Sequence, residues 1–222
     1  LEYTAKGAEY DLKNAQGVAE ARIFSISYTL NGVNDKSQRP LTFIYNGGPG
    51  SSSIWLHMAF IGPRVIDVPS DATAVGVPPY QLKDNPLSLL AVSDLVFIDP
   101  VGTGYSHALG KKKNKDYWGI DQDANSLNEF VRLYITRERR WNSPKYLLGE
   151  SYGTIRAAVM AEGLRDMNIS LNGIILVSPA MNMGTLPFFV TGNDLPYATH
   201  LPPIAATAFY HQRLPQQPEN FE

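Results

Sequence analysis

The sequence predicts an α/β protein with a mostly parallel β-sheet that is flanked by helices. Apolar segments typical of buried strands alternate with segments of helical periodicity. Two of the strands run directly into glycine-rich loops, at residues 46–50 and 102–106. Because the loops that follow parallel strands meet at one edge of the sheet, we expect the functional groups to gather there.

The composition is that of an ordinary globular domain. The 222 residues are 44% hydrophobic and 18% charged, with a formal net charge of −2. This balance argues against a nucleic-acid partner, and we interpret the lysine-rich run at 111–115 as a solvated loop. No apolar stretch reaches membrane-spanning length, and the absence of cysteine excludes disulfides and thiolate metal sites. The segment after Leu1 lacks the features of a signal peptide, so we interpret it as a mature or trimmed N-terminus.

Five strands can be placed from their side-chain patterns. Residues 18–30 alternate apolar and polar side chains between turn signals at 14–17 and 31–32, which predicts a half-buried strand in a hairpin or meander at the sheet edge. The other predicted strands are more uniformly apolar: residues 41–45, 94–99, 146–148 and 173–177.

The sequence also predicts two helices and a change of composition near residue 185. One helix should begin at Asp121 as its N-cap and end near Trp141, because apolar residues recur on one face at Leu127, Phe130, Val131 and Tyr134. A second helix should cover residues 154–166. We interpret residues 1–184 as the N-terminal part of the core. Residues 185–222, which are rich in proline and helical at 204–210, would be the beginning of a cap or lid.

A candidate nucleophile lies where the strand at 146–148 meets the second helix. Residues 149–153 have the sequence Gly-Glu-Ser-Tyr-Gly. A serine on a tight turn between a strand and a helix presents its hydroxyl clear of the backbone, and flanking glycines permit the close approach of neighbouring chain. Such a short pattern also occurs by chance, but the strand and the helix are predicted independently of it. We therefore interpret Ser151 as the nucleophile.

Two backbone N–H groups are candidates for stabilising the oxyanion that forms when a serine attacks a carbonyl carbon. One belongs to Tyr152, directly after the nucleophile. The other should come from a glycine-rich loop after an earlier strand, and residues 46–50, Asn-Gly-Gly-Pro-Gly, are in the right place. Pro49 has no N–H, which leaves Gly47 and Gly48; we select Gly48.

The general base that Ser151 needs is not evident. In hydrolases with such a turn, the acid and then the histidine follow the serine. Only His200 and His211 do so, and both lie in the predicted cap, where packing or ordinary polar roles are the better interpretation. His57 and His107 precede the serine. We therefore expect the catalytic Asp and His to be missing from this chain.

Three motifs together resemble the serine carboxypeptidase family. They are residues 46–53, residues 99–106 (Asp-Pro-Val-Gly-Thr-Gly-Tyr-Ser) and residues 149–153, in the order that the family has. The resemblance runs from roughly Leu41 to Leu214. It implies the first part of an α/β-hydrolase core, incomplete in this chain, with the entry to its helical cap. It also implies a serine-type carboxypeptidase that needs no cofactor or metal, with Ser151 as nucleophile and the Gly48 and Tyr152 N–H groups as oxyanion hole.

The resemblance further implies a site for the free C-terminal carboxylate of a peptide substrate. Asn46, the Gly47 N–H and Glu150 would contact it, with Glu150 as a neutral carboxylic acid that donates a hydrogen bond. A second glutamate usually stands just before Ile-Gly-Pro, where this chain has Phe60. Ser51 occupies a position where many members have a disulfide-forming cysteine, which indicates a divergent, bacterial-like branch.

Two classes of function follow from these features. The first is a serine carboxypeptidase, completed by a second polypeptide segment that carries the catalytic Asp and His; an acyltransferase or esterase would use the same machinery. The second is a non-catalytic remnant that binds peptide without turnover. The family tendency implies a secreted or periplasmic location. The charge balance and the lack of a long apolar stretch predict neither nucleic acid nor membrane as partner.

Overall fold

The computed structural model describes residues 1–69, 73, 76–180, 182–186 and 191–216. The chain divides into two compact units, Leu1–Pro179 and Ala180–Glu222. Among the helices of the described ranges, none is both long and apolar enough to cross a membrane. Part of the predicted cap, residues 187–190 and 217–222, lies outside the described residues.

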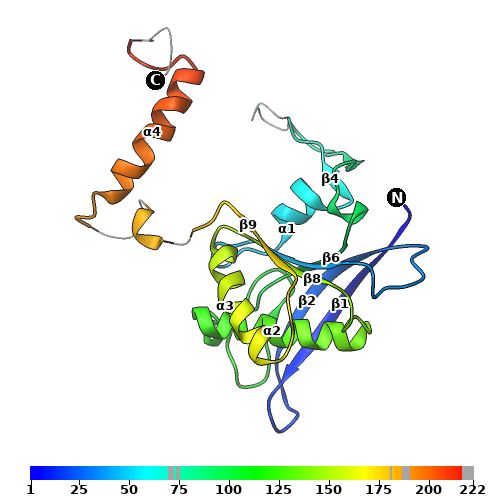
Figure 1. Cartoon of the computed structure of the whole chain (residues 1–222). Helices are drawn as coiled ribbons and strands as arrows, with labels where there is room; N and C mark the ends of the chain where they lie inside the picture. Colours follow the sequence, from blue (N-terminus) through cyan, green and yellow to red (C-terminus); the bar gives the residue numbers. More distant parts are fainter. Residues whose placement is uncertain (70–72, 74–75, 181, 187–190, 217–222) are drawn as a thin grey trace. The chain divides into compact units, whose positions relative to one another are not determined.

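The first unit is built on a mixed sheet with the strand order β1-β2-β6-β3-β8-β9 (Figure 1). Strands β1 and β2 form an antiparallel hairpin, β2 also pairs antiparallel with β6 and with the short β7, and β6, β3, β8 and β9 are parallel. The predicted α/β class and the edge hairpin are therefore confirmed. The bounds of these strands are β1 Tyr3–Lys13, β2 Ala19–Leu30, β3 Leu41–Tyr45, β6 Asp94–Ile98, β7 His107–Ala108, β8 Lys145–Glu150 and β9 Gly173–Val177.

The central strand β3 is buried on both faces, which explains its uninterrupted apolar sequence. Its residues Phe43 and Tyr45 belong to one core cluster, together with apolar side chains of α2 (Ile120–Arg137) and α3 (Tyr152–Asp166). Ile44 points to a second, smaller cluster with Leu56 of α1. The period of two along the strand thus divides the core between the two faces of the sheet.

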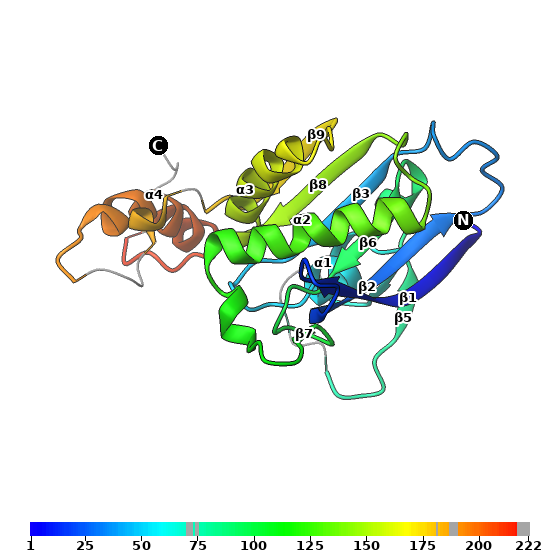
Figure 2. The same ribbon diagram turned by 90° about the horizontal axis from the view of Figure 1, so that it is seen from below.

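Helices lie on both faces of this sheet (Figures 1 and 2). Helices α2 and α3 cover one face. The short α1 and the two-stranded sheet of β4 and β5 lie on the other side. The bounds of the remaining elements of this unit are α1 Ile54–Leu56, a π-helical turn His57–Ile61, β4 Arg64–Ile66, β5 Leu82–Asp84, and 3-10 turns at Leu89–Ala91 and Asn114–Tyr117.

The predicted ends of α2 are wrong by a few residues. The helix begins at Ile120 with Gly119 as N-cap, so Asp121 lies in the first turn, where its negative charge is favourable for the helix dipole. It ends at Arg137 rather than near Trp141. The physical reason is that Arg139 adopts a positive φ of 56°, which is incompatible with continuing the helix.

The second unit contains the 3-10 turn Met183–Thr185 and helix α4, Leu195–Tyr210. The helix is longer than the predicted 204–210. Pro196 lies at its start, where no hydrogen-bond donor is needed. Pro202 and Pro203 lie inside the helix, which the sequence alone argues against because proline lacks an N–H.

Candidate active site

Ser151 occupies the turn between β8 and α3, in the strand–turn–helix arrangement of a nucleophile elbow. Its backbone has φ 57° and ψ −123°, a conformation that non-glycine residues seldom adopt. Hydrogen bonds hold it in place. The Ser151 N–H donates to the Val177 carbonyl (2.9 Å), and the Ser151 carbonyl accepts from the N–H (2.9 Å) and the hydroxyl (2.6 Å) of Thr154. The backbone is therefore anchored on both sides of the serine side chain.

The glycines around the elbow are required by close backbone contacts. A Cβ at Gly149 would fall 2.1 Å from the carbonyl oxygen of Gly153, within the turn itself. A Cβ at Gly47 would fall 2.5 Å from the Tyr152 nitrogen and 2.6 Å from the Glu150 carbonyl oxygen. The glycine-rich loop after β3 thus lies directly against the residues on either side of Ser151, although about 100 positions separate them in the chain.

This contact brings the two predicted oxyanion donors to the same end of the sheet. The Tyr152 N–H is at the first position of α3, where helical N–H groups have no partner within the helix. The Gly48 N–H follows Gly47 in the adjoining loop. Within the described parts of the chain, neither N–H donates a backbone hydrogen bond. Both are therefore available to an oxyanion.

The three residues predicted to bind a substrate carboxylate also lie together. Asn46 Nδ2 donates to Glu150 Oε2 (3.0 Å), and the Gly47 N–H donates to the same oxygen (3.4 Å). Asn46 Oδ1 accepts from the Leu56 N–H (3.1 Å), which fixes the orientation of the amide. Glu150 immediately precedes Ser151, so the cluster adjoins the nucleophile.

A buried ion pair supports this cluster, and the sequence prediction missed it. Arg156 of α3 is 1% exposed; its Nε donates to Asp123 Oδ2 of α2 (2.8 Å) and its Nη1 donates to the Asn46 carbonyl (2.7 Å). Burial and the neighbouring Asp123 raise the pKa of Tyr152 to about 12. One signal was present: Arg156 and Asp123 both fall on the apolar stripes of their helices, where a charged residue needs a partner.

The second glycine-rich loop is connected to the first by Asp99, the residue directly after β6. The carboxylate accepts from the Ser53 N–H (3.0 Å), and the Ser106 hydroxyl donates to the Asp99 carbonyl (2.6 Å). Burial raises the pKa of Asp99, while its hydrogen bonds from backbone N–H groups act in the opposite direction. A cavity of about 420 Å³ lies between the two loops; it is lined by Pro49, Gly50, Pro100, Val101, Gly102, Thr103, Tyr117, Trp118, Asp123 and Arg156.

The histidines of the first unit have other partners. His57 Nε2 is 2.7 Å from the Tyr28 hydroxyl, and its ring stacks on Phe97 with centroids 4.4 Å apart. Burial lowers the pKa of His57 to about 4. His107 is exposed, with Nδ1 3.0 Å from the Tyr105 carbonyl. Each of the two histidines thus has a ring nitrogen engaged by a residue other than Ser151.

The two histidines after the serine belong to helix α4 and its C-terminal end in the second unit. His200 Nδ1 donates to the Pro196 carbonyl (2.8 Å), within the same helix. The ring of His211 packs against that of Tyr210, with centroids 5.0 Å apart. Phe60, in place of the family's second glutamate, is exposed on the π-helical turn.

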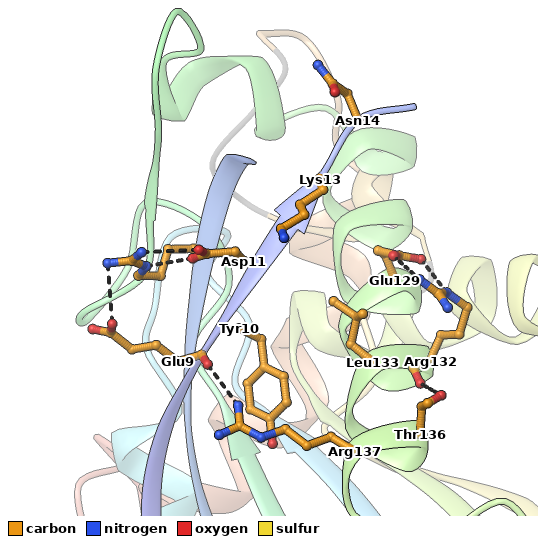
Figure 3. Close-up of a pocket in the computed structure, with 11 residues that line it drawn as sticks. Glu9, Tyr10, Asp11, Lys13, Asn14, Glu129, Arg132, Leu133, Thr136 and Arg137 are labelled. Carbon is orange, nitrogen blue, oxygen red and sulfur yellow. Dashed lines mark hydrogen bonds and ion pairs between the residues drawn. The ribbon is translucent and has the colours of Figure 1, made fainter. Parts of the chain in front are cut away.

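A larger groove of about 680 Å³ lies between the hairpin β1–β2 and α2 (Figure 3). None of the predicted site residues lines it. Its charged side chains are largely paired with one another: Arg22 with Asp11 and Glu9, and Arg132 with Glu129. This pairing leaves little unsatisfied charge for a ligand, so the groove is a weaker candidate than the elbow.

The comparisons with known proteins identify the family of the chain. Residues 21–186 match a family described as serine carboxypeptidase. "Serine carboxypeptidase-like 5" of Arabidopsis thaliana is 28% identical over 173 residues, which cover 76% of this chain and 36% of that protein. A pheromone-processing carboxypeptidase of Puccinia graminis f. sp. tritici is 29% identical over 154 residues, covering 67% of this chain and 22% of that protein.

Solved structures show the same fold. A prohormone-processing carboxypeptidase from Saccharomyces cerevisiae superposes with a TM-score of 0.68 at 21% identity, covering 95% of this chain and 48% of that one. A peroxisomal alpha-beta-hydrolase from the same yeast gives a TM-score of 0.51 at 13% identity, covering 86% of this chain and 47% of that one.

Fold and elbow together define an α/β-hydrolase core. Within that class, the match over residues 21–186 places the chain: it belongs to the serine carboxypeptidase family. The chain spans less than half the length of each of these relatives.

Proposed function

We propose that the complete protein is a serine-type carboxypeptidase that releases C-terminal residues from peptides through an acyl-enzyme on Ser151. The observation that carries the proposal is the adjacency of two groups of donors. The Tyr152 N–H directly follows Ser151, the Gly48 N–H follows Gly47 in the loop that packs against Tyr152, and Asn46 and Gly47 donate to Glu150, the residue before Ser151. The first group suits the oxyanion of an acyl transfer, and the second suits a free carboxylate one residue away.

The reaction would proceed in two steps. In acylation, Ser151 Oγ attacks the carbonyl carbon of the last peptide bond while a histidine accepts the hydroxyl proton. The oxygen becomes negatively charged and accepts hydrogen bonds from the two N–H groups. The C–N bond then breaks as the histidine returns the proton to the departing amine. In deacylation, water attacks the acyl-enzyme by the same route, which restores Ser151.

The catalytic Asp and His of this mechanism would come from a second polypeptide segment. The proposal rests on the interactions of His57 and His107, which are engaged elsewhere, and on the fraction of its relatives that this chain covers. The substrate partner is a peptide with a free C-terminus, and no cofactor takes part. We also propose a secreted or periplasmic location, in keeping with the family tendency.

The cluster of Asn46, Gly47 and Glu150 would give the enzyme its specificity for a free C-terminus. A free C-terminal carboxylate would be repelled by an ionised Glu150, whereas a neutral carboxylic acid donates a hydrogen bond to it. The Asn46 amide and the Gly47 N–H already point at the Glu150 carboxyl group and would share the bound carboxylate. An esterase or acyltransferase would have no need of this arrangement.

The test is Ser151→Ala in the complete protein, assayed on N-blocked dipeptides with a free C-terminus. We expect turnover to be lost, by roughly 10⁴-fold or more, while the affinity for a product peptide stays within a few-fold of wild type. A matched control is Ser170→Ala, which changes an exposed serine after α3. Turnover near the wild-type rate in Ser151→Ala would assign the chemistry to another residue. Peptide binding without turnover in the wild type would favour a non-catalytic remnant.

A further inference from the structure

Arg156 is the buried charged residue that reaches the candidate site without belonging to the predicted set. We propose that Arg156 is a positioning residue: it fixes the peptide group between Asn46 and Gly47, and thereby the geometry of the oxyanion hole. This inference rests on the proposed function, because it concerns the same site. One guanidinium group contacts Asn46 at the start of the first glycine-rich loop and the ring of Tyr152 beside the nucleophile.

The first contact sets the direction of a backbone N–H. Arg156 Nη1 donates to the Asn46 carbonyl at 2.7 Å. That carbonyl and the Gly47 N–H belong to one planar peptide group and point in opposite directions. The N–H side of the same group donates to Glu150 Oε2 at 3.4 Å. The peptide plane is therefore held from both sides, and its orientation determines where the next N–H, that of Gly48, can point.

The second contact is with the other half of the oxyanion hole. The guanidinium carbon of Arg156 lies 5.1 Å from the ring centroid of Tyr152, whose N–H is the other predicted donor. It also lies 5.3 Å from the ring centroid of Tyr45, the residue before Asn46. The same cation thus packs against the ring of one donor residue and against the ring at the end of the strand that leads to the other, at distances at which cation–π attraction acts.

The ion pair with Asp123 makes this placement possible. A buried guanidinium needs a carboxylate partner, and Arg156 Nε donates to Asp123 Oδ2 at 2.8 Å. A buried ion pair is weak evidence for stability, because apolar side chains of the same volume often stabilise a core as well. What an apolar side chain at position 156 cannot do is donate to the Asn46 carbonyl. Lysine also lacks the planar fork that serves Asn46 and Asp123 together.

The chain offers a matched control at the opposite end of the sheet. Arg140 Nη1 donates to Asp94 Oδ2 at 2.5 Å, and both side chains are 3% exposed. Asp94 is the first residue of β6, whereas the site lies beyond the last residues of the parallel strands. Asp94 also pairs with Arg39 Nε (2.9 Å), so loss of Arg140 should lower stability without leaving Asp94 unpaired and without moving the oxyanion hole.

The experiment compares Arg156→Met, Arg156→Lys and Arg140→Met in the complete protein. The concentration of competent enzyme is set by titration with a fluorophosphonate, which labels the reactive serine. For Arg156→Met we expect kcat on a blocked dipeptide to fall by roughly 10²-fold and KM to change by less than about threefold, since misplacement by about 1 Å costs that much in rate. Affinity for a peptidyl boronic acid, which forms a tetrahedral adduct, should fall in parallel with kcat/KM.

The controls separate positioning from folding. Arg156→Lys should recover little of the lost kcat, and Arg140→Met should lower the unfolding midpoint while kcat per titrated site stays at the wild-type value. If Arg156→Met does not fold, Asp123→Asn provides the readout, with an expected loss in kcat of about 10²-fold, the lower end of the range for the loss of one oxyanion-hole donor. Wild-type kcat and boronate affinity in the folded Arg156 or Asp123 variants would overturn the positioning role alone. Absence of Ser151-dependent turnover in the wild type would overturn the proposed function, and this inference with it.

Discussion

Substitution of Gly47 by alanine is the most direct test of the packing between the glycine-rich loop and the elbow. The added Cβ would lie 2.5 Å from the Tyr152 nitrogen, 2.6 Å from the Glu150 carbonyl oxygen and 2.9 Å from the Gly153 nitrogen. All three atoms are backbone atoms, so no side chain can rotate away to make room. The loop and the elbow must separate instead.

The size of the separation can be worked out from these contacts. Ordinary van der Waals contact begins at 3.4 Å, so the shortest contact must lengthen by about 0.9 Å. A displacement of this size moves the Gly48 N–H relative to the Tyr152 N–H, and the two would no longer converge on one oxyanion. We expect kcat/KM to fall by roughly 10²-fold, equivalent to about 2.7 kcal/mol of transition-state stabilisation. The strain should also lower the free energy of unfolding by about 1–3 kcal/mol.

The assay is hydrolysis of a blocked dipeptide by the complete protein, normalised to serine sites titrated with a fluorophosphonate. The control is Gly7→Ala in β1, where the added Cβ would meet only ordinary contacts at 3.6 Å. That variant should keep its kcat/KM. If Gly47→Ala retained kcat/KM within about threefold of wild type, the loop would not contribute a donor to the oxyanion hole, and the argument from close packing would be refuted.

Three further predictions concern substrate recognition, completeness and pH. Glu150→Gln should keep activity on free-acid peptides, because an amide N–H donates a hydrogen bond to a carboxylate, whereas Glu150→Ala should lower the ratio of activity on free-acid to C-terminal amide substrates; an unchanged ratio in Glu150→Ala would remove Glu150 from C-terminal recognition. The 222-residue chain alone should be inactive on peptides, because the catalytic Asp and His are expected in another segment; Ser151-dependent activity of the isolated chain would contradict this. The isolated chain should also be poorly soluble, since Ile174, Ile175 and Leu176 of β9 are 39–41% exposed. Burial lowers the pKa of His57 from 6.5 to about 4, so between these values the unfolded chain binds a proton that the native protein does not. The free energy of unfolding should therefore be unaffected by His57 above about pH 6.5 and should fall by roughly 3 kcal/mol between pH 6.5 and pH 4. Denaturant unfolding of His57→Gln at both pH values should lack this part of the pH dependence.

Much of the fold could be predicted because its signals are local. Alternation along residues 18–30 reflects one buried face of β2, and the apolar run at 41–45 reflects a strand buried on both faces. The elbow is local as well, because the strand, the turn and the helix are consecutive in the chain. The C-terminal end of α2 was harder to predict. The helix ends where Arg139 adopts a left-handed conformation, and arginine is not a residue type that indicates such a conformation.

The site is only partly local. Residue types and motif order were enough to predict Ser151 and the glycine-rich loop, because a tight turn and a close backbone approach restrict the residues that fit. The support of that loop by Arg156 depends on Asn46, 110 positions earlier, and on Asp123, 33 positions earlier. Nothing in the neighbouring sequence specifies such partners. The two helices meet only because α2 and α3 pack side by side on one face of the sheet. A buried charge such as that of Arg156 is stable only where this packing supplies an oppositely charged side chain.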